Sequence, residues 1–171
     1  MQIAIIGNSG SGKSTLAAQF ARMQGLPTLD LDTVAWESDQ IAVPREPRLA
    51  LAQVRRFCTT EPHWVVEGCY AGLIQAALPL TSLLLFLEPG VATCIAHCHS
   101  RPWEPHKFKS PEEQDRHFSH LLAWVRDYYR RDGDASLRQH QALFDAFDGP
   151  KHKLTARTTA SAFGEPSLQP V

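Results

Sequence analysis

A glycine-rich stretch near the start of the chain has the spacing of a phosphate-binding loop. Residues 7–14 match the pattern G-x-x-x-x-G-K-[ST] between an apolar run and an amphipathic segment. Glycines there let backbone N–H groups turn toward a phosphate at a helix start. Lys13 would place its charge beside the β- and γ-phosphates, and the Ser14 hydroxyl would ligate Mg²⁺. The candidate ATP-binding residues are Gly7, Asn8, Ser9, Gly10, Ser11, Gly12, Lys13, Ser14 and Thr15.

Two aspartates at the end of an expected strand are the next candidates. Asp30 and Asp32 lie two residues apart, which sends both side chains to the same side of the sheet. One carboxylate could hold Mg²⁺ through water while the other accepts a hydrogen bond from a substrate hydroxyl. We assign the metal to Asp30 and the catalytic role to Asp32. The alternative is that both residues cap the following turn or helix.

Two glutamates compete for a second metal-holding position. Glu67 ends a short apolar strand, and Glu88 ends a longer one before Pro89-Gly90. Either fits the pattern of a hydrophobic strand followed by an acid that holds a Mg²⁺ water. We rank Glu67 first because the sequence after Glu88 is also that of a plain turn. A salt-bridged surface acid is the alternative for Glu67.

Cations are required because phosphoryl transfer spreads negative charge over the migrating group. Arg101 begins a proline-rich excursion and Arg116 lies near its far end, so both are catalytic candidates. Arg126, Arg130 and Arg131 follow on the next expected helix. Because five acids share residues 101–131 with these arginines, an ordinary solvated face is the alternative.

Apolar runs alternate along the chain with amphipathic segments that must position these residues. Strands are expected at 3–6, 26–31, 64–67, 81–87 and 151–156. Helices are expected from residue 13 to a stop at Gly25, and at 48–58, 91–100, 118–129 and 135–147. This alternation predicts a three-layer α/β fold with helices on both faces of a parallel five-stranded sheet. In such folds, ligands bind at the carboxyl ends of the strands.

The chain is expected to form one domain over residues 1–157. A lid-like insertion is expected near residues 101–117, because residues 101–114 contain three prolines and charges of both signs without an apolar period. This segment would close over bound substrates. Residues 158–171 lack periodicity and are expected to form a tail.

Three segments of residues 1–90 carry a resemblance to a known family. Ile5-Ile6-Gly7 with the loop, Leu29-Asp30-Leu31-Asp32, and Trp64-Val65-Val66-Glu67-Gly68-Cys69-Tyr70 resemble the DNA topology modulation proteins, which are adenylate-kinase-related kinases. More broadly, the region is similar to P-loop kinases such as adenylate kinase and shikimate kinase. The resemblance implies the P-loop NTPase fold with strand order 2-3-1-4-5. It further implies that the two aspartates divide metal and acceptor roles, that Glu67-Gly68 is the acidic-Gly step of nucleoside monophosphate kinases, and that Arg101 begins the lid.

Composition limits the partners and the location. The 171 residues are 43% hydrophobic and 20% charged, and 17 Lys and Arg against 18 Asp and Glu give a net charge of −1. With no global basic field, extended contact with nucleic acid or anionic lipid is not expected. The four cysteines lack C-x-x-C spacing and are expected to be reduced. The N-terminus does not resemble a secretory signal and the apolar run 83–87 is too short to cross a bilayer, so we expect a cytoplasmic protein.

The leading hypothesis is a Mg²⁺-dependent kinase that moves the γ-phosphate of ATP to a small-molecule or nucleotide acceptor. A P-loop ATPase or nucleotide-dependent regulatory module acting on DNA topology is the alternative, and a nucleotide sensor without turnover is a third. The sequence does not choose the acceptor, because the two aspartates favour a polyol or hydroxy acid while Glu67-Gly68 favours a nucleotide.

Overall fold

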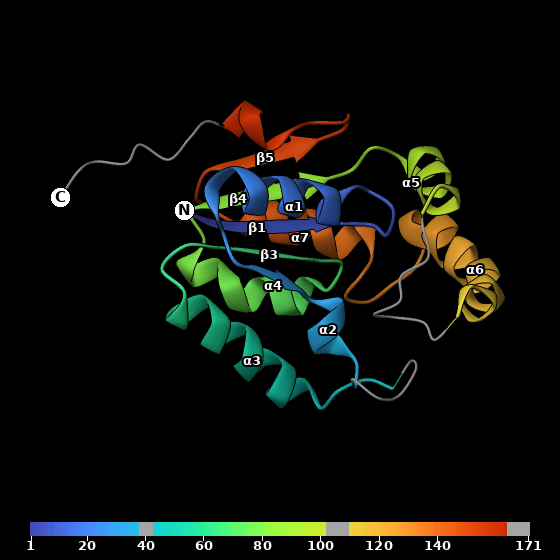
Figure 1. The fold of residues 1–171 in the computed structure, drawn as a ribbon, viewed down its shortest axis with the longest axis horizontal. Helices are drawn as coiled ribbons and strands as arrows, with labels where there is room; N and C mark the ends of the chain where they lie inside the picture. The colour runs from blue at the N-terminus through green and yellow to red at the C-terminus, as the bar shows by residue number, and fades with distance from the viewer. Residues whose placement is uncertain (38–42, 102–109, 164–171) are drawn as a thin grey trace.

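A computed structural model of the protein describes residues 1–37, 43–101 and 110–163. Its centre is a parallel five-stranded sheet of β1 (Gln2–Gly7), β2 (Thr28–Asp30), β3 (Trp64–Gly68), β4 (Leu83–Leu87) and β5 (Lys151–Leu154). The strand order β2-β3-β1-β4-β5 confirms the expected sheet and order (Figure 1). β1 lies in the middle because its residues are apolar on consecutive positions, which suits a strand covered on both faces.

Helices cover both faces of the sheet. They are α1 (Lys13–Gln24), α2 (Asp32–Ala35), α3 (Pro47–Thr60), α4 (Ala71–Ala77), α5 (Val91–His99), α6 (Pro111–Arg126) and α7 (Leu137–Ala146), with 3₁₀ turns η1 (Leu78–Leu80), η2 (Asp127–Tyr129) and η3 (Ala160–Phe163). Ala4 and Ile6 of β1 pack in the core formed with α3, α4 and α7, whereas Ile3 and Ile5 pack in the core formed with α1. This alternation along one strand makes three layers, as expected.

Near the site, the structure differs from the expected elements at the short helix α2, at α4 and at the start of α6. α4 was not expected, because its small residues Ala71, Gly72, Ala76 and Ala77 give a weak apolar period. α6 begins at Pro111, where the Ser110 side chain accepts a hydrogen bond from the Glu113 N–H and caps the helix. The expected excursion therefore ends several residues earlier than the sequence suggests, and its residues 102–109 lie outside the described part.

The start of the expected tail packs against the domain. Ala160 is fully buried, and its N–H donates to the Gln19 side chain of α1 at 2.9 Å. The ring centroid of Phe163 lies 6.1 Å from that of Phe20. Residues 160–163 thus extend the core on the α1 side, although they carry no periodic signal. Residues 164–171 lie outside the described part. Within the described residues, none of the helices has the length and apolarity to span a membrane.

A buried histidine connects α7 to the turn that follows β3. His140 is fully buried. Its Nε2 lies 2.8 Å from the Cys69 carbonyl oxygen, which only accepts, so Nε2 carries the proton. Its Nδ1 then accepts from the Tyr128 hydroxyl at 2.7 Å. His140 thereby fixes the backbone between Gly68 and Tyr70, at the carboxyl edge of the sheet.

Acid should destabilise the fold through this histidine. Burial lowers the pKa of His140 from its ordinary value of 6.5 to about 4. The unfolded chain therefore binds the proton first, and the free energy of unfolding should fall by up to about 3 kcal/mol as the pH drops through this window. His140→Gln should be less stable at neutral pH but should show a flatter decline in acid. Urea unfolding across this pH range measures both effects. The exposed His120→Gln is the control, and an unchanged acid slope in His140→Gln would contradict the assignment.

Candidate active site

A cavity of about 980 Å³ opens at the carboxyl edge of the sheet. The loop between β1 and α1 forms its floor, and α5 and α6 stand beyond the sheet edge and border one side (Figure 1). The turns after β2 and β3 border the other side, and residues 154–158 after β5 close a third. With Leu87 and Pro89 at the end of β4, the cavity is lined by segments from the ends of all five strands, where an α/β fold is expected to bind its ligand.

Glycine is required at different positions of the loop for different structural reasons. Gly10 and Gly12 have φ angles of 76° and 97°, in the left-handed region where a side chain is strained. Gly7 was expected to need the same freedom, but it is absent from the positive-φ glycines. A Cβ on Gly7 would instead lie 2.4 Å from the Leu87 carbonyl oxygen of β4. Gly7 is therefore required for close approach of two backbones, not for an unusual turn.

Three polar side chains of this loop are buried, those of Asn8, Ser11 and Lys13. Lys13 is only 8% exposed, and its Nζ donates to the Asn8 carbonyl at 2.9 Å. The Ser11 hydroxyl is buried and has no hydrogen-bond partner within the described residues. An unpartnered buried hydroxyl is costly, and a phosphate oxygen in the loop would offer it an acceptor. The loop therefore fits a nucleotide phosphate.

Ser14 and Glu67, two of the residues predicted to hold a metal, contact each other where the loop meets α1. The Ser14 hydroxyl donates to Glu67 Oε1 at 2.5 Å, and Asp30 pairs with Glu67 in the β2–β3 register. Glu67 is 4% exposed, and this burial raises its pKa, opposed by the charge of Lys13 and the Ser14 hydrogen bond. Glu88, the competing candidate, accepts from the Tyr129 hydroxyl instead. The structure thus brings Ser14, Asp30 and Glu67 together.

These three residues suit Mg²⁺ in a particular way. Hydroxyl and carboxylate oxygens are the donors that Mg²⁺ prefers. Within residues 1–37, 43–101 and 110–163, no group of three or more His, Cys, Asp and Glu residues is arranged to hold a metal ion. Mg²⁺ commonly binds through one or two protein groups together with nucleotide phosphates and waters, and the donor set here fits that mode.

Asp32 is held by a hydrogen-bonded chain that the sequence does not reveal. The Trp36 Nε1 lies 2.8 Å from the Tyr70 hydroxyl, which lies 2.8 Å from Asp32 Oδ1. Because an indole N–H can only donate, the Tyr70 hydroxyl accepts from Trp36 and donates to Asp32. Burial raises the pKa of Tyr70 far above its usual range, so it remains a donor. All three side chains line the cavity.

The contacts of the two aspartates also agree with the alternative prediction that these residues cap the following turn or helix. Asp30 Oδ1 accepts from the backbone N–H of Asp32 at 2.9 Å, and Asp32 is the first residue of the short helix α2. Asp30 therefore shapes the turn locally, as a capping residue does. Both side chains nevertheless line the cavity with Glu67, so the capping contact and a place in the site coexist.

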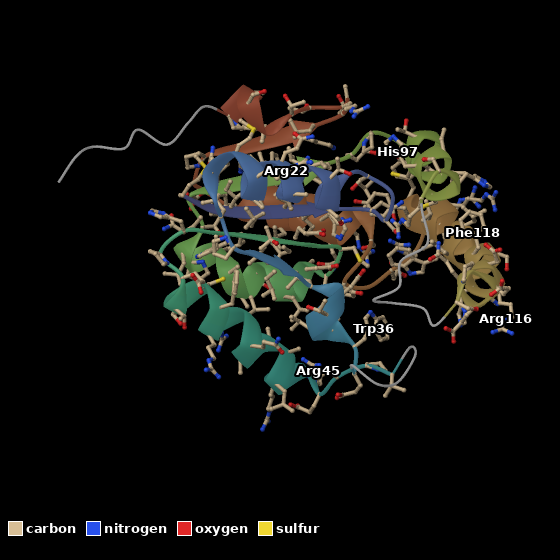
Figure 2. The ribbon with its side chains drawn as sticks, viewed as in Figure 1. Arg22, Trp36, Arg45, His97, Arg116 and Phe118 are labelled. Atoms are coloured by element: carbon tan, nitrogen blue, oxygen red, sulfur yellow. The ribbon has the colours of Figure 1, made fainter. Side chains whose placement is uncertain are left out.

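The expected cations are placed differently from one another. Arg101 lines the cavity at the end of α5, but Arg116 lies on an exposed part of α6 and is not among the lining residues. Figure 2 shows Arg116 on the outer side of α6, away from the loop. His97, which the sequence assigned to no role, lines the cavity and donates from Nδ1 to the Gly10 carbonyl at 2.8 Å. α5 therefore contacts the loop directly.

The cysteines of the chain are buried free thiols, as expected. Burial raises the pKa of Cys69, which lines the cavity, to about 12 and that of Cys94 to about 11. Both thiols stay protonated at neutral pH, and the thiolate is the form that attacks or binds metal. Thiol chemistry at these two positions is therefore disfavoured.

The chain is similar to several solved structures at low sequence identity. No protein-family model matches the chain, and no curated protein matches it. It is similar to a sugar kinase from Janibacter sp. HTCC2649, with 15% identity over 91% of this chain and 86% of that chain and a TM-score of 0.47. It is also similar to a deoxyadenosine kinase from M. mycoides with bound dATP, with 13% identity over 90% of this chain and 90% of that chain and a TM-score of 0.45. A third similar structure is a gluconokinase from Sinorhizobium meliloti 1021, with 19% identity over 91% of this chain and 83% of that chain and a TM-score of 0.48.

Gly10→Ala should damage the phosphate loop more than its backbone angle alone implies. A Cβ on Gly10 would lie 2.3 Å from the Cys94 carbonyl oxygen, whereas a Cβ on Gly133, with φ of 88°, meets no described atom within 4 Å. Gly133→Ala is thus the matched control and should cost about 1 kcal/mol of unfolding free energy. Gly10→Ala should cost about 2 kcal/mol more and weaken ADP binding. Urea unfolding and calorimetry measure the two effects, and equal losses would contradict the close contact.

Proposed function

We propose that the protein is a Mg²⁺-dependent phosphotransferase that moves the γ-phosphate of ATP to a hydroxyl of a small-molecule or nucleotide acceptor. The observation that carries this proposal is one cavity with two chemically different sides. A phosphate loop with a buried lysine forms one side, and a carboxylate oriented by a tyrosine forms the other. A nucleotide-binding module without an acceptor has no need for the second side.

The donor side would bind the nucleotide phosphates. Backbone N–H groups of the loop and the Ser11 hydroxyl would face phosphate oxygens, and Lys13 would leave the Asn8 carbonyl for the β- and γ-phosphates. Mg²⁺ bound with the nucleotide would neutralise charge on the phosphate oxygens, and Ser14, Asp30 and Glu67 would hold it.

The acceptor side would receive a hydroxyl group against Asp32. The hydroxyl oxygen bonds to the γ-phosphorus, the bond from that phosphorus to the β–γ bridging oxygen breaks, and the hydroxyl proton passes to Asp32. Tyr70 would keep the carboxylate in one orientation, because its hydrogen is directed at Oδ1 by the Trp36 indole. Holding reacting groups in place is a major part of phosphoryl-transfer catalysis.

The two arginines are assigned to the migrating charge. Arg101 already lines the cavity and would contact phosphate oxygens from α5. Arg116 would reach them only after α6 moves toward the loop, because in this arrangement its side chain is exposed. The lid role of residues 101–117 therefore requires a displacement of the first turns of α6.

The alternatives make different predictions. Three segments of residues 1–90 resemble DNA topology modulation proteins, a family that no family model confirms for this chain, and this resemblance leaves a regulatory ATPase as the second candidate. Such an ATPase would release ADP without an acceptor and respond to DNA, and a sensor would bind nucleotide without release.

Lys13→Ala should remove productive nucleotide binding while the fold persists. Wild-type protein should release ADP from ATP and Mg²⁺ faster when the correct acceptor is added from a panel of nucleosides, nucleoside monophosphates, polyols and sugar acids. Lys13→Ala should reduce that rate by about 10² or more, because a buried cation faces the phosphates. A coupled ADP-release assay and calorimetry with a non-hydrolysable ATP analogue measure both effects. Unchanged affinity and turnover in Lys13→Ala would refute the donor assignment.

Asp32→Asn should lower kcat by about 10² or more and leave the KM for ATP within a few fold, since it removes the proton acceptor. Tyr70→Phe should lower kcat about tenfold with the same unchanged KM, because the carboxylate loses its orienting donor. Tyr129→Phe is the matched control, since it also removes a tyrosine hydroxyl that donates to a carboxylate, Glu88. Steady-state kinetics with the acceptor found above measure the split. A rise in the KM for ATP without a fall in kcat would contradict the acceptor role.

A further inference from the structure

Arg131 lies just after η2 and has an unusual set of partners. Its guanidinium carbon lies 3.4 Å from the ring centroid of Trp124, so the cation stacks on the indole face. The guanidinium donates to the backbone carbonyls of Trp124 and Ala135 and, at 3.2 Å, to Asn8 Oδ1. Asn8 is the second residue of the phosphate loop. One side chain therefore connects the end of α6, the turn before α7 and the loop.

Asn8 completes this connection from the other direction. Its side chain is 1% exposed, and its Nδ2 donates to the Val125 carbonyl of α6 at 3.1 Å. Its Oδ1 accepts from the Ser9 N–H at 3.0 Å as well as from Arg131. Its backbone carbonyl accepts from Lys13. We call this set of contacts between Asn8, Arg131 and Val125 the Asn8 clasp.

The positive charge of Arg131 is not neutralised by its hydrogen-bond partners in the Asn8 clasp. All hydrogen-bond acceptors of Arg131 are neutral, and within the described part of the chain no carboxylate lies at ion-pair distance from it. Burial lowers the pKa of Arg131, yet a guanidinium stays charged in proteins. The positive charge therefore sits behind the phosphate loop. Arg131 is not among the residues that line the cavity, so it does not face the bound nucleotide.

We propose that Arg131 is a positioning residue of the phosphate loop, which holds Asn8 in place and raises the affinity for nucleotide phosphates without touching the nucleotide. The inference rests on the proposed function only in that the loop binds phosphate. Its physical basis is preorganisation: a loop already held in its binding conformation loses less conformational entropy when the ligand arrives. The fork of the guanidinium is essential, because a lysine in its place could not donate to three acceptors in one plane.

Arg131→Met tests the proposal through two ligands that differ in phosphate. In the full-length protein, binding of ADP with Mg²⁺ should weaken about tenfold or more, which is the loss typical of a charge-assisted hydrogen bond and its support. Binding of adenosine, which reaches the same cavity without the loop, should change less than about twofold. Arg131→Lys should recover only part of the ADP affinity, because it restores the charge but not the fork. The exposed Arg126→Met on α6 is the control and should bind both ligands as the wild type does.

Hydrogen exchange gives an independent measurement without any ligand. Backbone amides of residues 8–12 should exchange faster in Arg131→Met than in the wild type or Arg126→Met, while amides of β1 should not change. Should Arg131→Met fail to fold, Arg131→Lys decides by the same two measurements. Equal losses for ADP and adenosine, or unchanged exchange in the loop, would overturn the proposal. A wild-type protein that binds no ADP would instead refute the proposed function, and the exchange data alone would then decide whether the clasp holds the loop.

Discussion

The left-handed backbone of the phosphate loop is the constraint on which the rest of the site depends. Gly10 and Gly12 allow that conformation but do not stabilise it, because glycine also has the greatest freedom to adopt others. Neighbouring elements provide the restraint. His97 of α5 donates to the Gly10 carbonyl, and Val125 of α6 accepts from Asn8. Helices that stand beyond the sheet edge therefore do more than border the cavity: they stabilise its floor.

Negative and positive side chains lie on different sides of the cavity, and the buried carboxylate of Glu67 responds to both. Glu67 is raised in pKa by its burial and by Asp30 and Asp32 nearby, whereas Lys13 and the Ser14 hydroxyl favour its ionised form. The carboxylates lie at the ends of β2 and β3, and Arg101 lies just after α5. A magnesium–nucleotide complex bound as proposed would have this same polarity, with its cation toward the acids and its phosphates toward the loop. The site and its proposed ligand are thus complementary in charge.

Backbone-encoded features could be predicted from the sequence, and side-chain networks could not. The loop and the alternation of strands and helices follow from glycine spacing and apolar runs, which are local signals, whereas the strand order was implied by the resemblance to P-loop kinases. α4 was missed because small residues weaken its period, and residues 160–163 because a single packed turn has none. Tyr70 and Trp36 were missed for a different reason: Tyr70 contacts Asp32 across 38 residues of chain and Trp36 contacts Tyr70 across 34, and no spacing rule describes such contacts. Arg131 shared its segment with acids and resembled a solvated face until its stacking on Trp124 was known.

The two sides of the cavity consequently differ in how they can change. On the donor side, backbone groups and one lysine face the phosphates, so most substitutions there alter the loop itself. On the acceptor side, Asp32, Tyr70 and Trp36 act through side chains that leave from two turns. The turn after β3 is in addition anchored through the Cys69 carbonyl to His140, on a helix outside the cavity. Replacing a side chain on these anchored turns would change which hydroxyl compound fits without disturbing phosphate binding. Under the proposed function, acceptor specificity would therefore reside in the turns after β2 and β3, and the phosphate chemistry would reside in the loop after β1.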